Sequence, residues 1–300
     1  GFGLPELAVV LEAQGRDLCP GPFLPTVAAA VVIDRCGTEE LRAALLPGLA
    51  DGSTVAALGL SGHIHVSGHT VFGASPTVLG APDAALLVLV AGDDVAIVDA
   101  KATGVVVTAL DSADTTRSVG SVNLDQVAAI AVLRGAATKA HTAFRILAAA
   151  EAVGISWAAL DMAVEYAKVR EQFGRTIATF QAVKHHCANM AVAAESTVAA
   201  VWDAARAAGE SAEDGQSQFE LIAAAAATLA FPAYVRNAEL NIQVHGGIGF
   251  TWEHDAHLHL RRALTVQALL GGDGPPTEVF DLTALGISRP NSLDLPADAD

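Results

Sequence analysis

The sequence predicts an α+β protein in several parts, with N-terminal helices, a small antiparallel β domain and a C-terminal four-helix bundle. Its 300 residues are 52% hydrophobic and 17% charged, which is enough apolar material for a globular core. The composition changes near residues 52 and 136. We therefore divide the chain into a helical segment 1–51, a β domain 52–135, a bundle 136–285 and a tail 286–300.

Two or three short helices are predicted between residues 5 and 51. Leu4, Leu7 and Leu11 share one face at helical spacing, and Thr38 followed by two glutamates is a typical helix start. Because the sequence begins at Gly1 rather than Met, we expect an upstream piece to be missing.

The middle of the chain reads as β structure. It is rich in Val, Thr, Gly, Asp and Ser, and its apolar runs 85–90, 95–98 and 105–110 are separated by polar turns. A spacing of roughly ten residues per strand favours an antiparallel barrel or sandwich over alternating strands and helices.

From residue 136 to about residue 285 the pattern is helical, with breaks near Gly174, at 210–217 and at 246–249. Four helices joined by short loops predict an antiparallel bundle. An apolar stripe indicates a helix that buries one face: Phe173, Ile177, Phe180, Cys187, Met190, Val198 and Val201. From Arg289 the chain is polar, and we expect a loose tail.

Charge and cysteine content exclude several classes of protein. A net charge of −16 argues against nucleic-acid binding, which needs clustered cations. Three scattered cysteines suggest neither a disulfide framework nor a zinc site. No secretion signal opens the chain, and the apolar run 219–235 carries Glu220 and Pro232, so a buried helix is favoured over a membrane span. We expect a cytoplasmic protein without membrane contact.

The segment Arg170 to Gln181 (REQFGRTIATFQ) is a candidate cofactor site. The Arg170 guanidinium offers fixed donors to phosphate oxygens, Phe173 offers a packing surface, and the Gln181 amide can donate or accept. The alternative is an exposed arginine at a helix end with Phe173 in the core.

A second candidate segment runs from Gln243 to Phe250 (QVHGGIGF). Its three glycines permit positive φ and let backbone N–H groups approach an anionic ligand closely. The alternative is that the glycines only end one helix and turn the chain into the next.

The order of the parts and these two segments resemble the acyl-CoA dehydrogenase family, whose patterns are R-x-x-F-G-x-x-[IL]-x-x-x-Q and Q-x-x-G-G-x-G. The resemblance is strong over residues 136–285, moderate over 5–60 and weak over 61–135. It implies FAD-dependent dehydrogenation of an acyl-CoA, with Arg170 and Gln181 reaching a neighbouring subunit's FAD. The full cofactor set it implies is Arg170, Gln172, Phe173, Ile177, Gln181, Gln243, Gly246 and Gly247.

The family's reaction also needs a glutamate that removes the α-proton of the acyl thioester. By resemblance its commoner location falls on Leu270 and its alternative location on Phe144, beside Arg145. Neither side chain accepts a proton, so no catalytic residue is assigned. Glu151 and Glu253 are the candidates for a relocated base, each with a simpler structural explanation: a bond within the bundle for Glu151, a helix-start carboxylate for Glu253.

The β domain also departs from the family pattern. Residues 56–63 and 69–76 stand where members carry strands that hold the flavin ring, and no Trp occurs before Trp157. The chain therefore resembles the non-catalytic subunit of the heterotetrameric acyl-CoA dehydrogenases that actinobacteria use on steroid side chains. That resemblance implies a base-bearing paralogue as partner and an FAD shared with it. The alternatives are an active dehydrogenase with a relocated base, and a structural or acyl-CoA-binding homologue without FAD.

A metal site is not expected among the ten histidines. His254 and His257 share a helix face, but His259 points elsewhere. Cys187 lies on an apolar face and is read as a core residue rather than a nucleophile.

Overall fold

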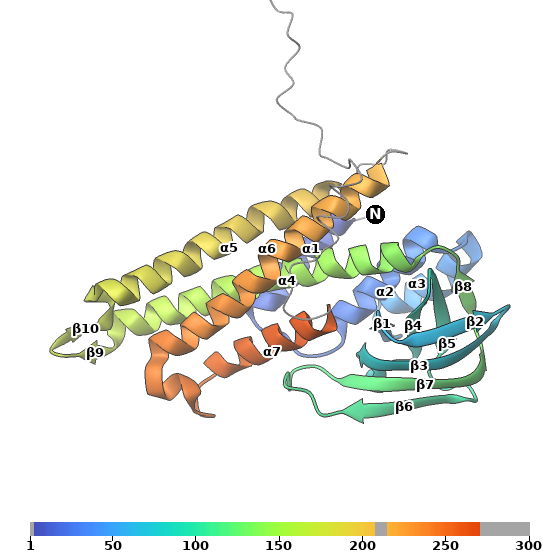
Figure 1. Ribbon diagram of the computed structural model, residues 1–300, viewed down its shortest axis with the longest axis horizontal. Helices are drawn as coiled ribbons and strands as arrows, with labels where there is room; N and C mark the ends of the chain where they lie inside the picture. The colour runs from blue at the N-terminus through green and yellow to red at the C-terminus, as the bar shows by residue number, and fades with distance from the viewer. Residues whose placement is uncertain (1–2, 208–214, 271–300) are drawn as a thin grey trace, which may run out of the picture.

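The computed structural model describes residues 3–207 and 215–270 (Figure 1). Long helices form one part of the molecule, and a sheet packs at one end of them. The N-terminal helices lie along the bundle and reach the sheet, so the sequence order of helices, strands and helices is the predicted one.

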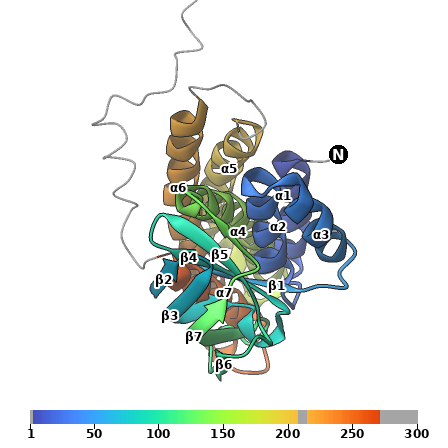
Figure 2. The ribbon, with the colours of Figure 1, turned by 90° about the vertical axis from the view of Figure 1, so that its right-hand side faces the viewer.

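Three helices precede the sheet: α1 (Leu4–Arg16), α2 (Phe23–Cys36) and α3 (Glu39–Ala50). The predicted start at Thr38 is confirmed, since its Oγ1 accepts a hydrogen bond of 3.3 Å from the Leu41 N–H. α1 packs on α4, while α2 packs on both α4 and β1 (Figure 2). The N-terminal segment thus joins the bundle to the sheet.

Eight strands form one sheet in the order β6-β7-β3-β1-β4-β5-β8, with β2 paired to β3. The strands are β1 (Ala56–Gly59), β2 (His63–Ser67), β3 (Thr70–Leu79), β4 (Leu86–Ala91), β5 (Asp94–Asp99), β6 (Val105–Leu110), β7 (Val119–Ala128) and β8 (Ala131–Leu133); the 3-10 helix η1 (Ala81–Asp83) follows β3. All pairs are antiparallel except β1 and β4, which run parallel with Leu58 opposite Val88. The antiparallel prediction is therefore correct for every pair except β1 and β4. These two strands are not consecutive in the chain: β2 and β3 come between them, and β4 then pairs with the free edge of β1.

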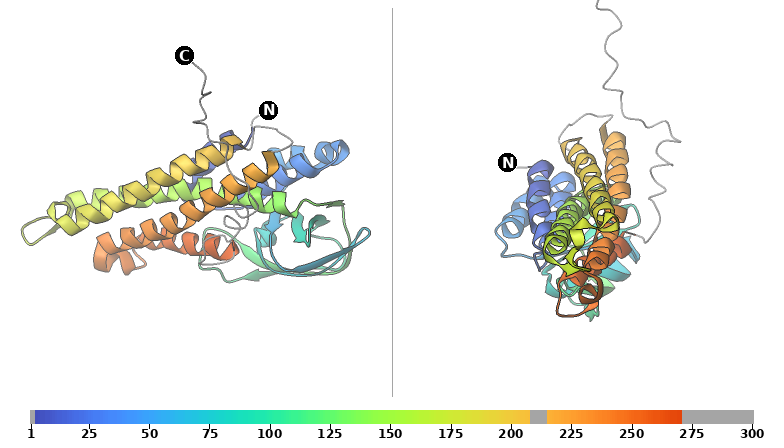
Figure 3. Two further views of the ribbon diagram at one scale, coloured as in Figure 1. Left: turned by 45° about the horizontal axis from the view of Figure 1, so that its top comes forward. Right: turned by 90° about the vertical axis from the view of Figure 1, so that its left-hand side faces the viewer.

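Four helices form the bundle: α4 (Ala137–Val169), α5 (Gln181–Ala207), α6 (Gly215–His245) and α7 (Ala256–Leu269). Figure 3 shows α4, α5 and α6 running side by side, with the shorter α7 beneath α6. Alanine is the commonest buried residue of α4 and α6, which lets these helices approach closely. The connections contain a hairpin of β9 (Glu171–Gln172) and β10 (Arg175–Thr176) and the 3-10 helices η2 (Ile177–Thr179) and η3 (Gly246–Phe250).

The apolar stripe predicted along one helix is only partly correct. Met190 and Val201 are buried on α5 as expected, and Cys187 is half-buried. However, Phe173, Ile177 and Phe180 lie before α5, in the hairpin and the turn that follows it. Glycine at 174 permits the turn, and the chain becomes helical only from Gln181.

Several sequence predictions concern residues outside the described ranges: the helical continuation from 271 to 285, the tail 286–300 and most of the polar break at 210–217. Two helices, Ala137–Val169 and Phe219–Phe250, are long and apolar enough to pass a membrane-span test by composition. Of their most apolar windows, 78% and 44% respectively are buried within the fold, and buried core helices pass the same test.

Candidate functional site

Arg170 is positioned by the end of α4. Its N–H donates to the Tyr166 carbonyl at 2.9 Å, and its own carbonyl accepts from the Ile177 N–H at 2.8 Å, across the hairpin. These two bonds end the helix and close the base of the β9–β10 hairpin. The Arg170 side chain is exposed.

The tip of the hairpin is Phe173-Gly174, with φ of 55° and 76°. Two consecutive positive φ values are typical of the tight turn that joins two antiparallel strands, and they are unusual for a phenylalanine. Phe173 is 91% exposed, so the alternative that it is a core residue is wrong. The turn therefore holds the Phe173 ring in solvent, where it is available to pack against another molecule.

The rest of the first segment is ordered by local contacts. The ring of Phe180 lies between Phe173, edge-on at 6.1 Å, and the Arg175 guanidinium, 4.3 Å from the ring centre. Gln181 starts α5, and its Nε2 lies 3.0 Å from His185 Nε2, while Gln172 donates to the Glu171 carbonyl. All of these side chains project from one end of the bundle.

The second segment ends α6 and forms η3. Gly246 has a φ of 63°, and a side chain added at Gly246 or Gly247 would meet nothing within 4 Å. Gln243, one turn earlier, is exposed. The backbone of this turn is therefore open to approach from outside.

The structure brings the two segments to the same end of the bundle. The His245 ring stacks on Tyr166 of α4 at 4.3 Å, one turn before Arg170. Ile177 and Val244 belong to one apolar cluster between α4, α5 and α6. This end lies opposite the β domain, as Figure 1 shows for the hairpin and the α6–α7 turn. The predicted cofactor residues therefore lie together, and they lie far from the chain's own sheet.

These residues fit an elongated anionic cofactor such as FAD. Within residues 3–207 and 215–270 no acidic side chain pairs with Arg170, so its guanidinium is available to phosphate oxygens. The open backbone at Gly246 and Gly247 allows the close approach that a pyrophosphate needs. The exposed Phe173 ring adds an apolar surface beside them.

Comparison with known proteins identifies the family. Residues 134–274 match the family model for the acyl-CoA dehydrogenase C-terminal domain. IpdE2 of Mycobacterium tuberculosis, an acyl-CoA dehydrogenase, is 32% identical over 88% of this chain and 72% of that protein. The chain belongs to the acyl-CoA dehydrogenase family.

Other relatives agree with this assignment. FadE34 of M. tuberculosis, also an acyl-CoA dehydrogenase, is 39% identical over 98% of this chain, and the chain spans only 40% of its length. Among solved structures, a variant of the Tcur3481-Tcur3483 steroid ACAD has a TM-score of 0.87 and 31% identity, covering 95% of this chain and 82% of that one. The ChsE4-ChsE5 complex from M. tuberculosis has a TM-score of 0.85 and 27% identity, covering 97% and 82%. The predicted fold is confirmed.

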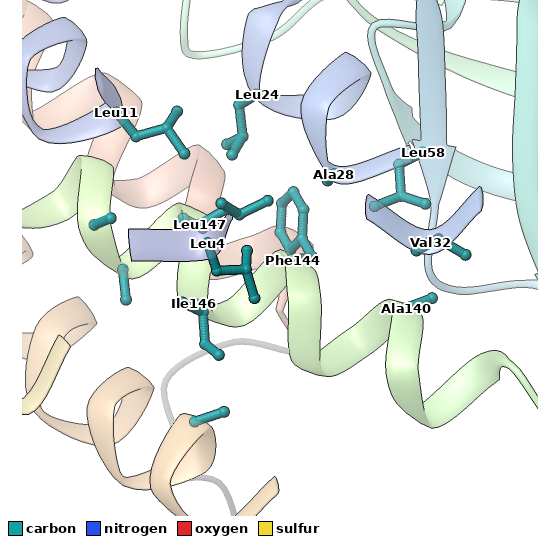
Figure 4. Packing of buried hydrophobic residues seen from close by; sticks show 14 of the residues in the cluster. Leu4, Leu11, Leu24, Ala28, Val32, Leu58, Ala140, Phe144, Ile146 and Leu147 are labelled. Atoms are coloured by element: carbon teal, nitrogen blue, oxygen red, sulfur yellow. The ribbon is translucent and has the colours of Figure 1, made fainter. Parts of the chain in front are cut away.

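Neither position at which the family's base was expected carries a carboxylate. Leu270 is half-buried at the end of α7. Phe144 of α4 is 1% exposed and packs among residues of α1, α2 and β1, as Figure 4 shows with Leu4, Ala28 and Leu58. An acyl-CoA dehydrogenase with these residues has no proton acceptor at either place.

The two candidates for a relocated base are both engaged elsewhere. Glu151 is 1% exposed and ion-paired with Arg117 and, at 3.5 Å, with Arg262. Glu253 is exposed, and a hydrogen bond from the Thr251 side chain lowers its pKa, which weakens it as a base. The expectation that Glu151 bonds within the bundle is only partly correct, because Arg262 belongs to α7 whereas Arg117 belongs to the β domain.

Sequence reasoning missed the charged cluster around Glu151. It also contains Asp114, Arg117 and Arg262, from a loop of the β domain and from α7. Burial, followed by the positive charge of Arg262, lowers the pKa of Arg117 to about 10. No sequence pattern reveals this cluster, because its members lie in separate segments and each reads as an ordinary surface charge.

The histidines occupy two environments. His245 and His254 lie with ring centres 4.2 Å apart beside the glycine turn, and burial lowers the pKa of His245. His259 is buried on α7, and burial lowers its pKa to about 4. Among the residues that the structure describes, no group of three or more His, Cys, Asp or Glu could hold a metal ion.

Proposed function

We propose that this chain is a subunit of an FAD-dependent acyl-CoA dehydrogenase that lacks the catalytic glutamate and contributes contacts to the tail of an FAD held mainly by a base-bearing paralogue. The proposal depends on a contrast between the positions expected for the base and those expected for the cofactor. Leucine and phenylalanine occupy the two expected base positions, whereas the predicted cofactor residues are present and lie together at an exposed end of the bundle.

FAD supplies the hydride acceptor for α,β-dehydrogenation of an acyl-CoA. This chain's residues have a binding role. Arg170 binds phosphate oxygens, the open backbone at Gly246 and Gly247 lets the cofactor approach closely, and the amides of Gln181 and Gln243 bind polar groups of the adenosine part. Gln172, Phe173 and Ile177 shape the hairpin and its apolar surface. The proton is removed by the partner's glutamate.

The residues around the two candidate cofactor segments support the proposal that this end of the bundle contacts a partner subunit. Large apolar side chains are exposed there, on the hairpin and the glycine turn: Val169, Phe173, Ile248, Phe250 and Trp252. Exposed aromatic and aliphatic side chains gathered at one end of a helical bundle are typical of an interface. The similar solved structures, Tcur3481-Tcur3483 and ChsE4-ChsE5, are each named for two components, which supports a heteromeric assembly, and we propose a heterotetramer.

The substrate is proposed to be an acyl-CoA seated mainly in the partner, with a steroid side-chain ester as its class. This rests on the similarity to Tcur3481-Tcur3483, which is described as a steroid ACAD. We place the complex in the cytoplasm, without a membrane or nucleic-acid partner.

The proposal is tested on the complex, co-expressed with a base-bearing paralogue. Arg170→Gln and Gln181→Ala should each weaken FAD binding about tenfold or more, since each removes hydrogen bonds, those of Arg170 to charged groups. Lys168→Gln is the matched control, because it removes a charge at the same end of α4 from an exposed pair with Glu165. FAD affinity is measured by the recovery of flavin fluorescence on dilution.

The alternatives predict different results. Unchanged FAD affinity in the Arg170 and Gln181 variants would favour a homologue that does not touch FAD. A yellow, active chain without the partner would favour a dehydrogenase that carries its own relocated base.

A further inference from the structure

A buried charged cluster connects α7 to three other parts of the chain. Its four charged side chains are at most 4% exposed: Asp114, Arg117, Glu151 and Arg262. Two guanidinium groups and two carboxylates balance in charge, which reduces the cost of removing them from water. Tyr234 of α6 is also buried against the two arginines, whose positive charges oppose the rise that burial causes in its pKa.

Arg262 makes the largest number of connections. Its Nη2 donates to the carbonyls of Leu18 and Cys19, at 3.2 and 3.0 Å, in the loop between α1 and α2. Its Nε donates to Thr116 Oγ1 at 3.1 Å and lies 3.4 Å from Asp114, while Nη1 lies 3.5 Å from Glu151. One side chain of α7 thus contacts the N-terminal segment, the β domain and α4.

A second bond ties the same face of α7 to the β domain. The N–H of Asp114 donates to Thr265 Oγ1 at 3.2 Å, one turn after Arg262. Asp114 in turn accepts from the Thr116 N–H at 2.9 Å, which orders the loop. The loop between β6 and β7 is therefore fixed to α7 at two points.

Apolar packing alone would hold α7 weakly. The buried residues of this helix are Ala256, His259, Arg262, Ala263 and Val266. Two alanines and one valine bury little apolar surface, although Leu269 and Leu270 also pack against the core at the end of the helix. The hydrogen bonds of Arg262 and Thr265 therefore add a directional attachment in the middle of α7.

The opposite face of α7 contacts the residues that follow the glycine turn. Trp252 packs on Arg261, with 5.2 Å from the guanidinium carbon to the ring centre, and on His257, with ring centres 4.9 Å apart. The Ala256 N–H donates to His254 Nδ1 at 3.1 Å, and His254 packs on His245. Contacts therefore run without a gap from Arg262 through α7 to the Gly246–Phe250 turn.

We propose that Arg262, assisted by Thr265, is a positioning residue for the Gly246–Phe250 turn. The turn is short and glycine-rich, so its place depends on the helices at its two ends. α6 is held against α4 by the stacking of His245 on Tyr166, and α7 is held by Arg262. Arg262 thereby sets the position of the turn relative to Arg170. The inference rests on the proposed function, because it assigns the turn to FAD binding.

The test compares Arg262→Gln and Thr265→Val with Thr265→Ser in the complex with the partner. Arg134→Gln is the matched control, since it breaks an arginine–aspartate pair in which Arg134 is largely exposed and which joins the end of β8 to the start of β5. We measure FAD affinity, kcat at saturating FAD, and hydrogen exchange of the amides of residues 246–250. The exchange rates report how firmly the turn is held, without reference to the cofactor.

The expected result has three parts. Arg262→Gln and Thr265→Val weaken FAD binding about fivefold and speed exchange in the turn, and kcat at saturating FAD stays within about twofold of wild type. Thr265→Ser keeps the hydroxyl and should therefore keep wild-type FAD affinity and wild-type exchange in the turn. Arg134→Gln should change neither the affinity nor the exchange. If Arg262→Gln does not fold, the pair Thr265→Val and Thr265→Ser decides.

Unchanged FAD affinity in both variants, while Arg170→Gln does lose FAD, would overturn the inference. So would a fall in kcat that saturating FAD does not correct, because that result indicates a general loss of structure. If Arg170→Gln also kept its FAD, the proposed function itself would fail, and the two failures are thus distinguished.

Discussion

Gly15 of α1 lies directly against the backbone carbonyl of Glu151 in α4, so that a side chain at residue 15 would collide with that oxygen. The contact is reciprocal, because a side chain at Gly154 of α4 would collide with the carbonyl of Glu12. The two helices therefore meet at their backbones. This close crossing holds α1 against the part of α4 that contains Glu151, which is a member of the charged cluster.

Because the two helices meet at their backbones, we expect a glycine-to-alanine substitution there to lower the stability of the protein instead of raising it. Alanine normally stabilises a helix interior relative to glycine by about 0.5–1 kcal/mol. At Gly154 we expect the opposite, a loss of about 1–3 kcal/mol, because the helices must move apart. Gly247→Ala is the control, since its site is open, and should change the free energy of unfolding by less than about 0.5 kcal/mol. Urea denaturation measures both; a stabilised Gly154→Ala variant would contradict the packing described.

The charged cluster predicts a large effect of removing one charge. Glu151→Gln leaves two buried arginines with one carboxylate and should cost about 3–5 kcal/mol of stability. Replacing Glu151 by Leu together with Arg117 by Met removes a charge of each sign and should recover part of that loss. Neutralising the exposed Lys168–Glu165 pair should cost less than about 1 kcal/mol. Equal effects of the buried and exposed changes would count against the cluster.

Because His259 is buried, we expect the protein to lose stability in mild acid. Its folded-state pKa of about 4 lies below the usual 6.5, because burial and the Arg262 charge disfavour the protonated ring. The unfolded chain therefore binds the proton first, and stability falls as the pH drops from 6.5 towards 4. Between pH 7 and pH 5 the loss should be about 2 kcal/mol. In a His259→Leu variant the urea midpoint should depend less on pH; an unchanged slope would show that His259 is not responsible.

We expect glutamate to be tolerated very differently at the two positions where the resemblance places the family's base. Phe144→Glu places a carboxylate in the apolar core and should cost more than about 4 kcal/mol or prevent folding. Leu270→Glu lies half-buried at a helix end and should cost about 1 kcal/mol or less. Circular dichroism during denaturation compares the two. The folded Leu270→Glu chain should still show no turnover by itself; turnover would mean that only a base was missing.

Local patterns predicted the elements better than their long-range contacts. The Thr38 cap, the short strands of the middle segment and the four bundle helices follow from composition and periodicity, and all are present. The parallel β1–β4 pair could not be predicted, because pairing partners depend on the path of the whole chain. The spacing of Phe173, Ile177 and Phe180 predicts a helix, and that prediction is wrong because the Phe173-Gly174 turn decides the local structure.

The residues of the candidate site also fall into those that the sequence predicts and those that it does not. The two candidate cofactor segments are each continuous in sequence, so a local motif predicts them. Arg262 and Asp114 lie about 150 residues apart in sequence, and their contact depends on how α7 packs on the β domain. Such contacts leave no local signature.

We propose that this chain contributes contacts to a cofactor seated mainly in its partner and removes no proton itself. The most direct measurement is the flavin content and turnover of the purified complex, with the partner's base either intact or replaced. We predict about one FAD per pair of chains and a complete loss of turnover when only the partner's glutamate is changed. Two FAD per pair, with turnover that survives that change, would contradict the account.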